Sequence, residues 1–222
     1  MFCVKKLSGA IGAELTGVDL TDNLSEEILV SINEHLVKYE VVFFRDQDIS
    51  WEQHVKLGEF FGPLQSHPAY NSPPNYPEIT ILESTKDNPS KIECWHTDMT
   101  FLKNPPLCSI LRSKICPSKG GDTMWSSMTA AYESLSVSMK NFLKNLTAEH
   151  DFCHGFKESI AEPGGRERLK DAIKNNPPVV HPVIRTHPIT KRKAIFVNPL
   201  FTTKINELSK SESDALLEFL YS

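Results

Sequence analysis

The stretch Trp95-His96-Thr97-Asp98 places an imidazole and a carboxylate two residues apart, and the rest of the chain is interpreted around it. Thr100 and Phe101 continue the pattern, which predicts a short extended run. Side chains alternate between the two faces of a strand, so we expect His96 and Asp98 on one face. A 2-His-1-carboxylate set with open positions is typical of non-haem Fe(II) oxygenases. His-x-Asp alone is a weak motif, and taken by itself it favours a hydrogen-bonded structural pair over a metal site.

Length and composition fit one globular domain spanning residues 1–222. Hydrophobic residues make up 40% and charged residues 23% of the chain, which is ordinary for a soluble protein. The net charge of -4 provides no general basic field that would attract nucleic acid or a membrane surface. The chain has no apolar run of the ~20 residues that a membrane-spanning helix needs. Five cysteines without a Cys-x-x-Cys spacing favour reduced thiols, and we expect a cytoplasmic protein.

Helices are predicted where apolar residues recur at helical spacing and where capping boxes occur. Ile28, Ile32 and Leu36 lie four residues apart within a helix expected over residues 24–39. Two capping boxes of the form Ser-x-x-Gln or Ser-x-x-Glu begin at Ser50 and Ser209, so we expect a helix to start at each. The remaining helical predictions are two short helices over residues 129–135 and 139–146, and a charged, partly helical, mobile surface segment or lid over residues 158–176.

Strands are predicted where β-branched and aromatic residues cluster between turn residues. The expected strands lie in residues 2–20, 41–44, 78–82, 95–98, 107–115, 123–125, 150–152, 179–186 and 194–197. A proline-rich loop over residues 65–77 carries His67 and Tyr70. Many short strands with a few outer helices predict a mainly β fold, a double-stranded β-helix of the jelly-roll or cupin-like kind.

Several blocks of sequence occur in an order and at spacings that run through nearly the whole chain. They are residues 42–47 (VFFRDQ), 95–98 (WHTD), 120–125 (GGDTMW), 148–152 (AEHDF), 181–188 (HPVIRTHP), 196–198 (FVN) and 201–203 (FTT). Together they resemble the TauD/TfdA (taurine dioxygenase) family of Fe(II)/2-oxoglutarate-dependent dioxygenases. Each block alone is unspecific, whereas the combination favours the metal interpretation of His96 and Asp98 over the structural pair.

The resemblance implies a role for seven side chains of this sequence. His96 and Asp98 match two of the three iron ligands, and Thr123 matches a threonine that hydrogen-bonds a carboxylate of 2-oxoglutarate. The substrate-binding residues that the resemblance implies are the loop pair His67 and Tyr70 and the aromatic pocket walls Phe156 and Phe201. From the sequence alone, without the resemblance, both phenylalanines are better explained as core residues.

The sequence departs from the family pattern in three ways. Ile92 stands where the taurine enzyme has an asparagine, and Gly155 stands where it has a serine, so two polar donors are lost. The distal iron-binding histidine and the arginines that bind 2-oxoglutarate and sulfonate match no segment of the chain. We therefore expect a domain that lacks its C-terminal strands and is C-terminally incomplete, with a third ligand outside this chain.

The function that the resemblance implies is oxidation of a small organosulfonate such as taurine. Fe(II) is the implied metal, 2-oxoglutarate and O2 are the co-substrates, and sulfite, an aldehyde, succinate and CO2 are the products. Two alternatives stay open. Ile92 favours the same chemistry on an alkyl sulfate or an aryloxyacetate-type acid, and the missing third ligand favours a catalytically inactive binding module. No nucleic-acid or membrane partner is expected, and homo-oligomers are common in this fold class.

Overall fold

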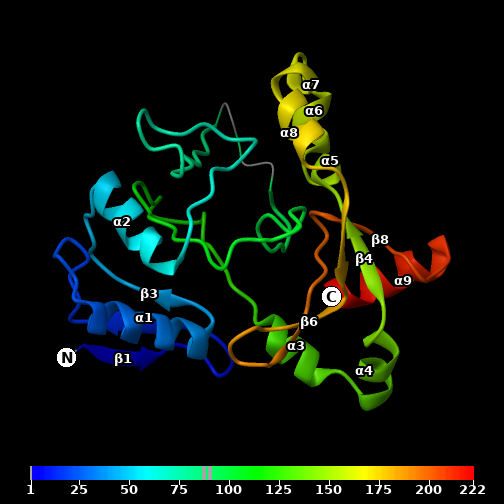
Figure 1. The fold of residues 1–222 in the computed structure, drawn as a ribbon, viewed down its shortest axis with the longest axis horizontal. Helices are drawn as coiled ribbons and strands as arrows, with labels where there is room; N and C mark the ends of the chain where they lie inside the picture. Colours follow the sequence, from blue (N-terminus) through cyan, green and yellow to red (C-terminus); the bar gives the residue numbers. More distant parts are fainter. Residues whose placement is uncertain (1, 87–88, 90–91) are drawn as a thin grey trace.

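The N-terminal third of the chain forms a small sheet covered by one helix. The computed structural model describes residues 2–86, 89 and 92–222 (Figure 1). Strand β1 (Cys3–Lys6) pairs antiparallel with β2 (Ala13–Thr16), which pairs parallel with β3 (Val42–Phe43). Helix α1 (Glu26–Tyr39) begins at Ser25, whose side chain accepts the Ile28 N–H. Leu15, Val18 and Ile32 form the core of this region.

Helix α2 (Trp51–Phe61) follows the N-terminal sheet and starts at the predicted capping box. The Gln53 N–H donates to Ser50 Oγ at 3.1 Å, and the Ser50 N–H donates to Gln53 Oε1 at 2.7 Å. Two backbone donors that a helix start leaves unpaired are therefore satisfied locally. This is why the four-residue pattern predicts the start of the helix without any knowledge of the fold.

A second, separate sheet lies in the C-terminal half. Strand β4 (Thr147–His150) is central, between β5 (Val179–Pro182) and β8 (Thr202–Ile205), and both pairings are antiparallel. Helix α9 (Lys210–Tyr221), with the second predicted capping box, packs its buried leucines on this sheet. The alternation of buried and partly exposed residues along β4 matches a strand with one face on the core.

Two short helices and a hairpin flank the second sheet. Helices α3 (Met128–Ser134) and α4 (Val137–Leu143) precede β4, and strands β6 (Ile184–Thr186) and β7 (Lys193–Ile195) form an antiparallel hairpin that contacts α3. The predicted turn over residues 187–193 is confirmed as the hairpin connection. The cause is local, because Ile189 and Thr190 donate their backbone N–H groups to His187 Nδ1, each at 3.2 Å.

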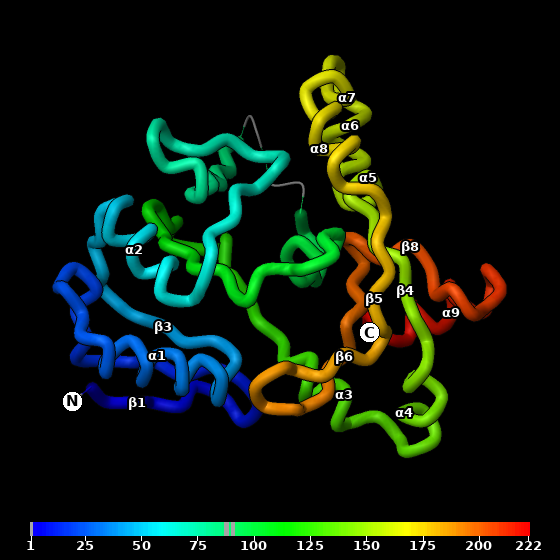
Figure 2. Tube along the Cα trace, in the orientation of Figure 1, coloured from blue at the N-terminus to red at the C-terminus, as the bar shows by residue number. Residues whose placement is uncertain are grey.

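The charged segment after β4 is a run of short helices that projects away from the sheet (Figure 2). They are α5 (Phe152–Gly155), α6 (Lys157–Ala161), α7 (Gly165–Arg168) and α8 (Lys170–Asn175). Its predicted helical character is confirmed, and its role as a lid stays a prediction. Leu169 and Ala172 are buried in one cluster with Phe152 of α5 and Phe156 after it, which gives the segment a core of its own.

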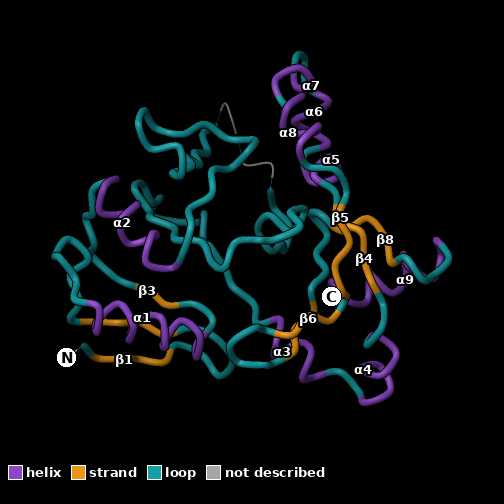
Figure 3. Tube along the Cα trace, in the orientation of Figure 1, coloured by secondary structure: helices purple, strands orange, loops and turns teal. Residues whose placement is uncertain are grey.

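The chain between α2 and α3 is loop throughout its described part (Figure 3). The strands predicted over residues 78–82, 95–98, 107–115 and 123–125 are therefore wrong. A strand needs a hydrogen-bonded neighbour, and no described segment pairs with these stretches. Their apolar side chains stay in solvent, with Leu111 63% and Ile115 88% exposed.

The predicted mainly β jelly-roll is correspondingly found only in part. Helical residues outnumber strand residues, and the described strands form three small open sheets rather than a closed barrel. None of the helices in the described part of the chain has the length and apolar character needed to cross a bilayer.

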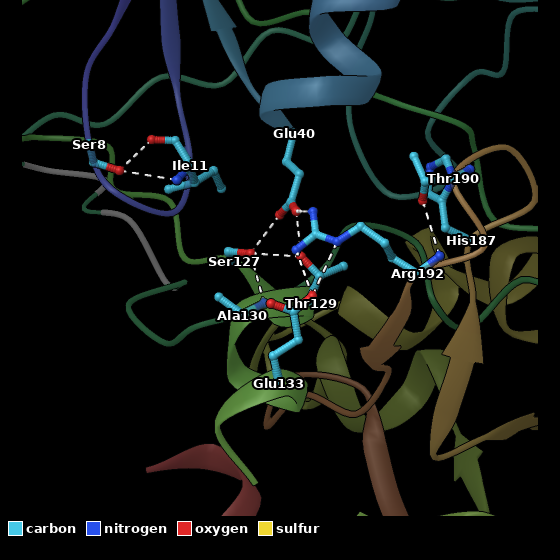
Figure 4. Close-up of polar contacts among 10 residues, drawn as sticks. All are labelled: Ser8, Ile11, Glu40, Ser127, Thr129, Ala130, Glu133, His187, Thr190 and Arg192. Carbon is cyan, nitrogen blue, oxygen red and sulfur yellow. Dashed lines mark hydrogen bonds and ion pairs between the residues drawn. The ribbon is translucent and has the colours of Figure 1, made fainter.

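One polar network connects the N-terminal sheet region to the C-terminal half (Figure 4). Glu40, the residue that ends α1, accepts hydrogen bonds from Ser127 Oγ at 2.7 Å, from Thr129 Oγ1, and from Arg192 Nη1 at 2.8 Å. Arg192 also pairs with Glu133 at 3.1 Å. Glu40 has a φ of 67°, a left-handed conformation that favours glycine. The side-chain network therefore explains why a strained glutamate is stable there.

Glu40→Ala is expected to lower the free energy of unfolding by about 1–3 kcal/mol. It removes the carboxylate acceptor of the buried Ser127 and Thr129 hydroxyls, and only one of the two can then donate to the other. Glu40→Gly loses the same bonds but relieves the backbone, so it should be about 1 kcal/mol more stable than Glu40→Ala. Urea unfolding of the two variants and the wild type measures both differences. Equal stability of all three proteins would show that the network contributes nothing.

Candidate active site

His96 and Asp98 lie side by side, although the strand predicted to align them is absent. His96 Nε2 is 3.3 Å from Asp98 Oδ1, and the side chains are 30% and 54% exposed. His96 Nδ1 lies 2.9 Å from the Cys94 carbonyl oxygen, so Nδ1 carries the proton and donates it there. That bond keeps a proton on Nδ1 and turns Nε2 toward the carboxylate, so Nε2 is the nitrogen that a metal ion would meet after losing its own proton.

The carboxylate has a second partner that the sequence does not reveal. Ser109 Oγ donates to Asp98 Oδ2 at 3.0 Å. The hydrogen bond with His96 lowers the pKa of Asp98, against the effect of partial burial, and the same bond raises the pKa of His96. Each group thus stabilises the charged form of the other. A cation between them would replace the shared proton, since metal ligands must be deprotonated.

The donor set fits two positions of a 2-His-1-carboxylate site. One imidazole nitrogen and one carboxylate oxygen converge, and both are ligands that iron accepts. Within residues 2–86, 89 and 92–222, no third His, Cys, Asp or Glu joins them closely enough to complete a metal site. His181, a histidine of the matching blocks, is directed into the core, where its Nε2 lies 3.0 Å from two backbone carbonyl oxygens.

An aromatic cluster adjoins the pair. The rings of His67 and Tyr70 lie 4.5 Å apart, and Phe156 lies 5.7 Å from His67 and 5.9 Å from Tyr70. Phe201 is 6.2 Å from Phe156 and is buried. The four residues that the resemblance assigned to the substrate are therefore brought together from the proline-rich loop, from the end of α5 and from the start of β8. Phe101, which was not among those four, is buried at their centre.

His67 and Tyr70 are hydrogen-bond donors in their neutral forms. Burial lowers the pKa of His67 to about 4, against the effect of the Asp98 charge, so the imidazole is neutral at pH 7. Its Nδ1 accepts the Ala69 N–H at 3.1 Å, which leaves the proton on Nε2. Burial, followed by the Asp98 charge, raises the pKa of the Tyr70 phenol, which therefore keeps its proton.

Two other positions singled out in the sequence, Thr123 and Gly155, have no described contact with His96 or Asp98. Thr123 is exposed in a loop, so its expected role toward 2-oxoglutarate stays a prediction. Gly155 has a steric reason to lack a side chain, because a Cβ there would lie 2.4 Å from the Phe201 ring. The serine of the family pattern would require Phe201 to move. This departure therefore alters the shape of the aromatic cluster as well as removing a donor.

Comparison with known proteins confirms the resemblance. The family described as "Taurine catabolism dioxygenase TauD, TfdA family" matches residues 4–222. An alkylsulfatase of Acinetobacter baylyi is 34% identical, with 98% of this chain and 69% of the relative covered. A Saccharomyces cerevisiae alpha-ketoglutarate-dependent sulfonate dioxygenase is 32% identical, with 98% of this chain and 54% of the relative covered.

A solved structure is also similar. The crystal structure of a taurine dioxygenase from Burkholderia xenovorans has a TM-score of 0.80 and 36% identity, and the match covers 99% of this chain and 71% of that one. The chain thus spans between about half and three quarters of the length of these proteins. Since the family match and the solved structure both extend over nearly all of its residues, the chain belongs to the TauD/TfdA dioxygenase family.

Proposed function

We propose that this chain is the major part of a 2-oxoglutarate-dependent dioxygenase that oxidises a small organosulfonate. The observation that carries the proposal is the 3.3 Å approach of His96 Nε2 to Asp98 Oδ1 next to a buried aromatic cluster. We also propose that residues 1–222 belong to one domain, whose third ligand and 2-oxoglutarate-binding arginine come from outside the described residues. The greater length of the relatives supports this.

In this proposal the residues of the chain hold and shield the reactants. His96 and Asp98 bind Fe(II), which when bound supplies the oxidising chemistry with 2-oxoglutarate and O2. The Cys94 carbonyl and Ser109 keep the two ligands in orientation. Neutral His67 and Tyr70 present N–H and O–H donors to a sulfonate, and the phenylalanines behind them exclude water, which suppresses side reactions. Thr123 is assigned to 2-oxoglutarate by the resemblance alone.

A sulfate ester is the second candidate substrate. The Ile92 side chain has neither a donor for the sulfonate group nor an acceptor for the ammonium group of taurine, and a relative at 34% identity is named an alkylsulfatase. The close contact of Phe201 with Gly155 adds apolar surface at the wall, which suits an alkyl chain better than a charged amine.

The proposed function is tested on a protein that carries these residues together with the proposed third ligand and arginine. It is incubated with Fe(II), 2-oxoglutarate and ascorbate and a panel of taurine, alkylsulfonates, alkyl sulfates and aryloxyacetates. Succinate formation that depends on a sulfonate, with release of sulfite, is the expected result. Release of sulfate from an alkyl sulfate would select the second candidate, and oxidation of aryloxyacetates alone would contradict both. Binding of these anions with no turnover would support the inactive binding module.

His67→Ala is expected to weaken sulfonate binding by about 10- to 100-fold, because a hydrogen bond to a charged group contributes about 1.5–3 kcal/mol. The affinity for 2-oxoglutarate should change much less. Anaerobic calorimetric titration with each ligand measures both. His154→Ala, which removes a partly exposed histidine of α5, is the matched control. Equal losses for both ligands would contradict the assignment of His67 to the substrate.

A further inference from the structure

A buried polar cluster lies directly behind the turn that carries Asp98. Its four members come from distant parts of the chain, and at most 6% of each is exposed. They are Thr100 of the turn, His150 of β4, His181 of β5 and Asn198 ahead of β8. His150 Nδ1 is 2.9 Å and Asn198 Nδ2 is 3.1 Å from Thr100 Oγ1. His181 Nε2 is 3.0 Å from both the Thr100 and the Leu102 carbonyl oxygens.

The hydrogen-bonding roles of Asn198 and His181 in this cluster can be assigned. Asn198 Oδ1 accepts the Phe201 N–H at 3.0 Å, so the Asn198 amide nitrogen is the group that donates to Thr100 Oγ1. The Thr100 hydroxyl also shares a hydrogen bond with His150 Nδ1, whose direction depends on the His150 tautomer. His181 faces two carbonyls, so its Nε2 is a donor. Burial lowers the pKa of His150 to about 4 and lowers that of His181 as well, which agrees with neutral imidazoles in these roles.

The turn that the cluster holds is strained. Residues 98–101 form a turn that the Leu102 N–H closes onto the Met99 carbonyl at 3.0 Å. Met99 has a φ of 52°, a left-handed conformation that costs a residue with a side chain roughly 1–2 kcal/mol. Such a conformation persists only where the surroundings determine it. Here three side chains bind the backbone or hydroxyl of the residue that follows Met99.

The second sheet places His150 and His181 next to the turn that contains Thr100. On β4 the register of the pairing with β8 shifts between Glu149 and His150, as it does at a bulge or a similar irregularity. Bulges redirect side chains and are frequent beside active sites. The rings of His150 and His181 meet edge to face, with centroids 5.1 Å apart. Cutting any of these hydrogen bonds leaves a buried polar group unpaired, so the arrangement has few alternatives.

We propose that Thr100, held by His150, His181 and Asn198, is a positioning residue that fixes the direction of the Asp98 carboxylate toward His96. This inference rests on the proposed function, because it assigns the cluster to the metal site of that proposal. Thr100 can affect Asp98 through the backbone of a single turn, since Asp98 is the first residue of that turn and Thr100 the third. Groups that hydrogen-bond a metal ligand affect metal affinity by about 10- to 100-fold. Thr100 touches neither ligand, so its effect should lie at the lower end of that range.

Thr100→Val, which keeps the shape but removes the hydroxyl, tests the proposal. The probe is Mn(II) alone, whose binding is followed by electron paramagnetic resonance below the unfolding temperature of every variant. We expect Thr100→Val to bind Mn(II) about 10-fold more weakly, the lower end of the effect of a group that hydrogen-bonds a ligand. Thr100→Ser should stay within about 3-fold of wild type because it retains the hydroxyl. Amide hydrogen exchange at Leu102 should also accelerate in Thr100→Val.

The control is Ser213→Ala, which removes a buried hydroxyl that accepts the Ile205 N–H, far along the chain from the turn. It should lower the unfolding temperature without changing Mn(II) affinity. Wild-type affinity in folded Thr100→Val would overturn the positioning role. If Thr100→Val does not fold, Asn198→Ala is measured in its place, because it removes the amide that donates to Thr100 Oγ1. Wild-type Mn(II) affinity in Asn198→Ala would then overturn the positioning role. If wild type and His96→Ala bind Mn(II) alike, the proposed metal site itself fails instead.

Discussion

His96→Ala is expected to lower the affinity for Fe(II) or Mn(II) by more than about 100-fold. The reason is that it removes one of two protein ligands, a larger change than the loss of a group behind a ligand, which costs about 10- to 100-fold. Asp98→Asn should have a similar effect, because it removes the negative charge while keeping the shape. Both changes should abolish turnover that depends on 2-oxoglutarate. Metal binding is measured by electron paramagnetic resonance and turnover by succinate formation.

The controls for these two variants come from the same region. Ser109→Ala removes only the hydrogen bond to Asp98 Oδ2, so its loss of affinity should be smaller than that of either ligand variant. Far-UV circular dichroism should be unchanged in all three proteins, since both ligand side chains are partly exposed. Wild-type metal affinity in His96→Ala would remove the basis for the proposed function and return the pair to a structural role.

Phe101→Ala is expected to lower the free energy of unfolding by about 3–5 kcal/mol. Phe101 is 1% exposed, and its ring lies 5.0 Å from Phe201 and 5.1 Å from Phe152. Truncation would open a cavity where three separate segments meet, and the neighbouring turn limits how far the site can collapse. Because whole domains are stable by only about 5–15 kcal/mol, this is a large fraction of the total.

Chemical denaturation of Phe101→Ala, Phe101→Leu and Phe142→Ala measures this effect. Phe101→Leu should cost less than Phe101→Ala because it fills more of the site. Phe142→Ala should be nearly neutral, since that ring is 50% exposed. A loss below about 1 kcal/mol for Phe101→Ala would mean that the aromatic cluster adjusts freely, and would contradict its role as a rigid wall.

Elements with local causes were predictable from the sequence. The starts of α2 and α9 depend on hydrogen bonds between residues three apart, so a four-residue pattern contains their whole cause. Strands depend on partners that are distant in the chain. Residues 107–115 have a strand-like composition, but no described segment pairs with them, so the prediction of a strand was wrong. The jelly-roll is found only in part for the same reason, since several of its predicted strands have no hydrogen-bonded neighbour among the described residues.

In the candidate site, too, some features follow from the local sequence and others only from the tertiary structure. The spacing in Trp95-His96-Thr97-Asp98 determined by itself that an imidazole and a carboxylate can share a cation, because two residues are too few for the backbone to separate them widely. The order of the sequence blocks determined the family. Only the tertiary structure decided that Ser109 supports Asp98 and that His150 and His181, 50 and 81 residues from Thr100, hold the turn from behind. Buried polar groups must find partners wherever the fold brings them, and no local pattern records which partner that is.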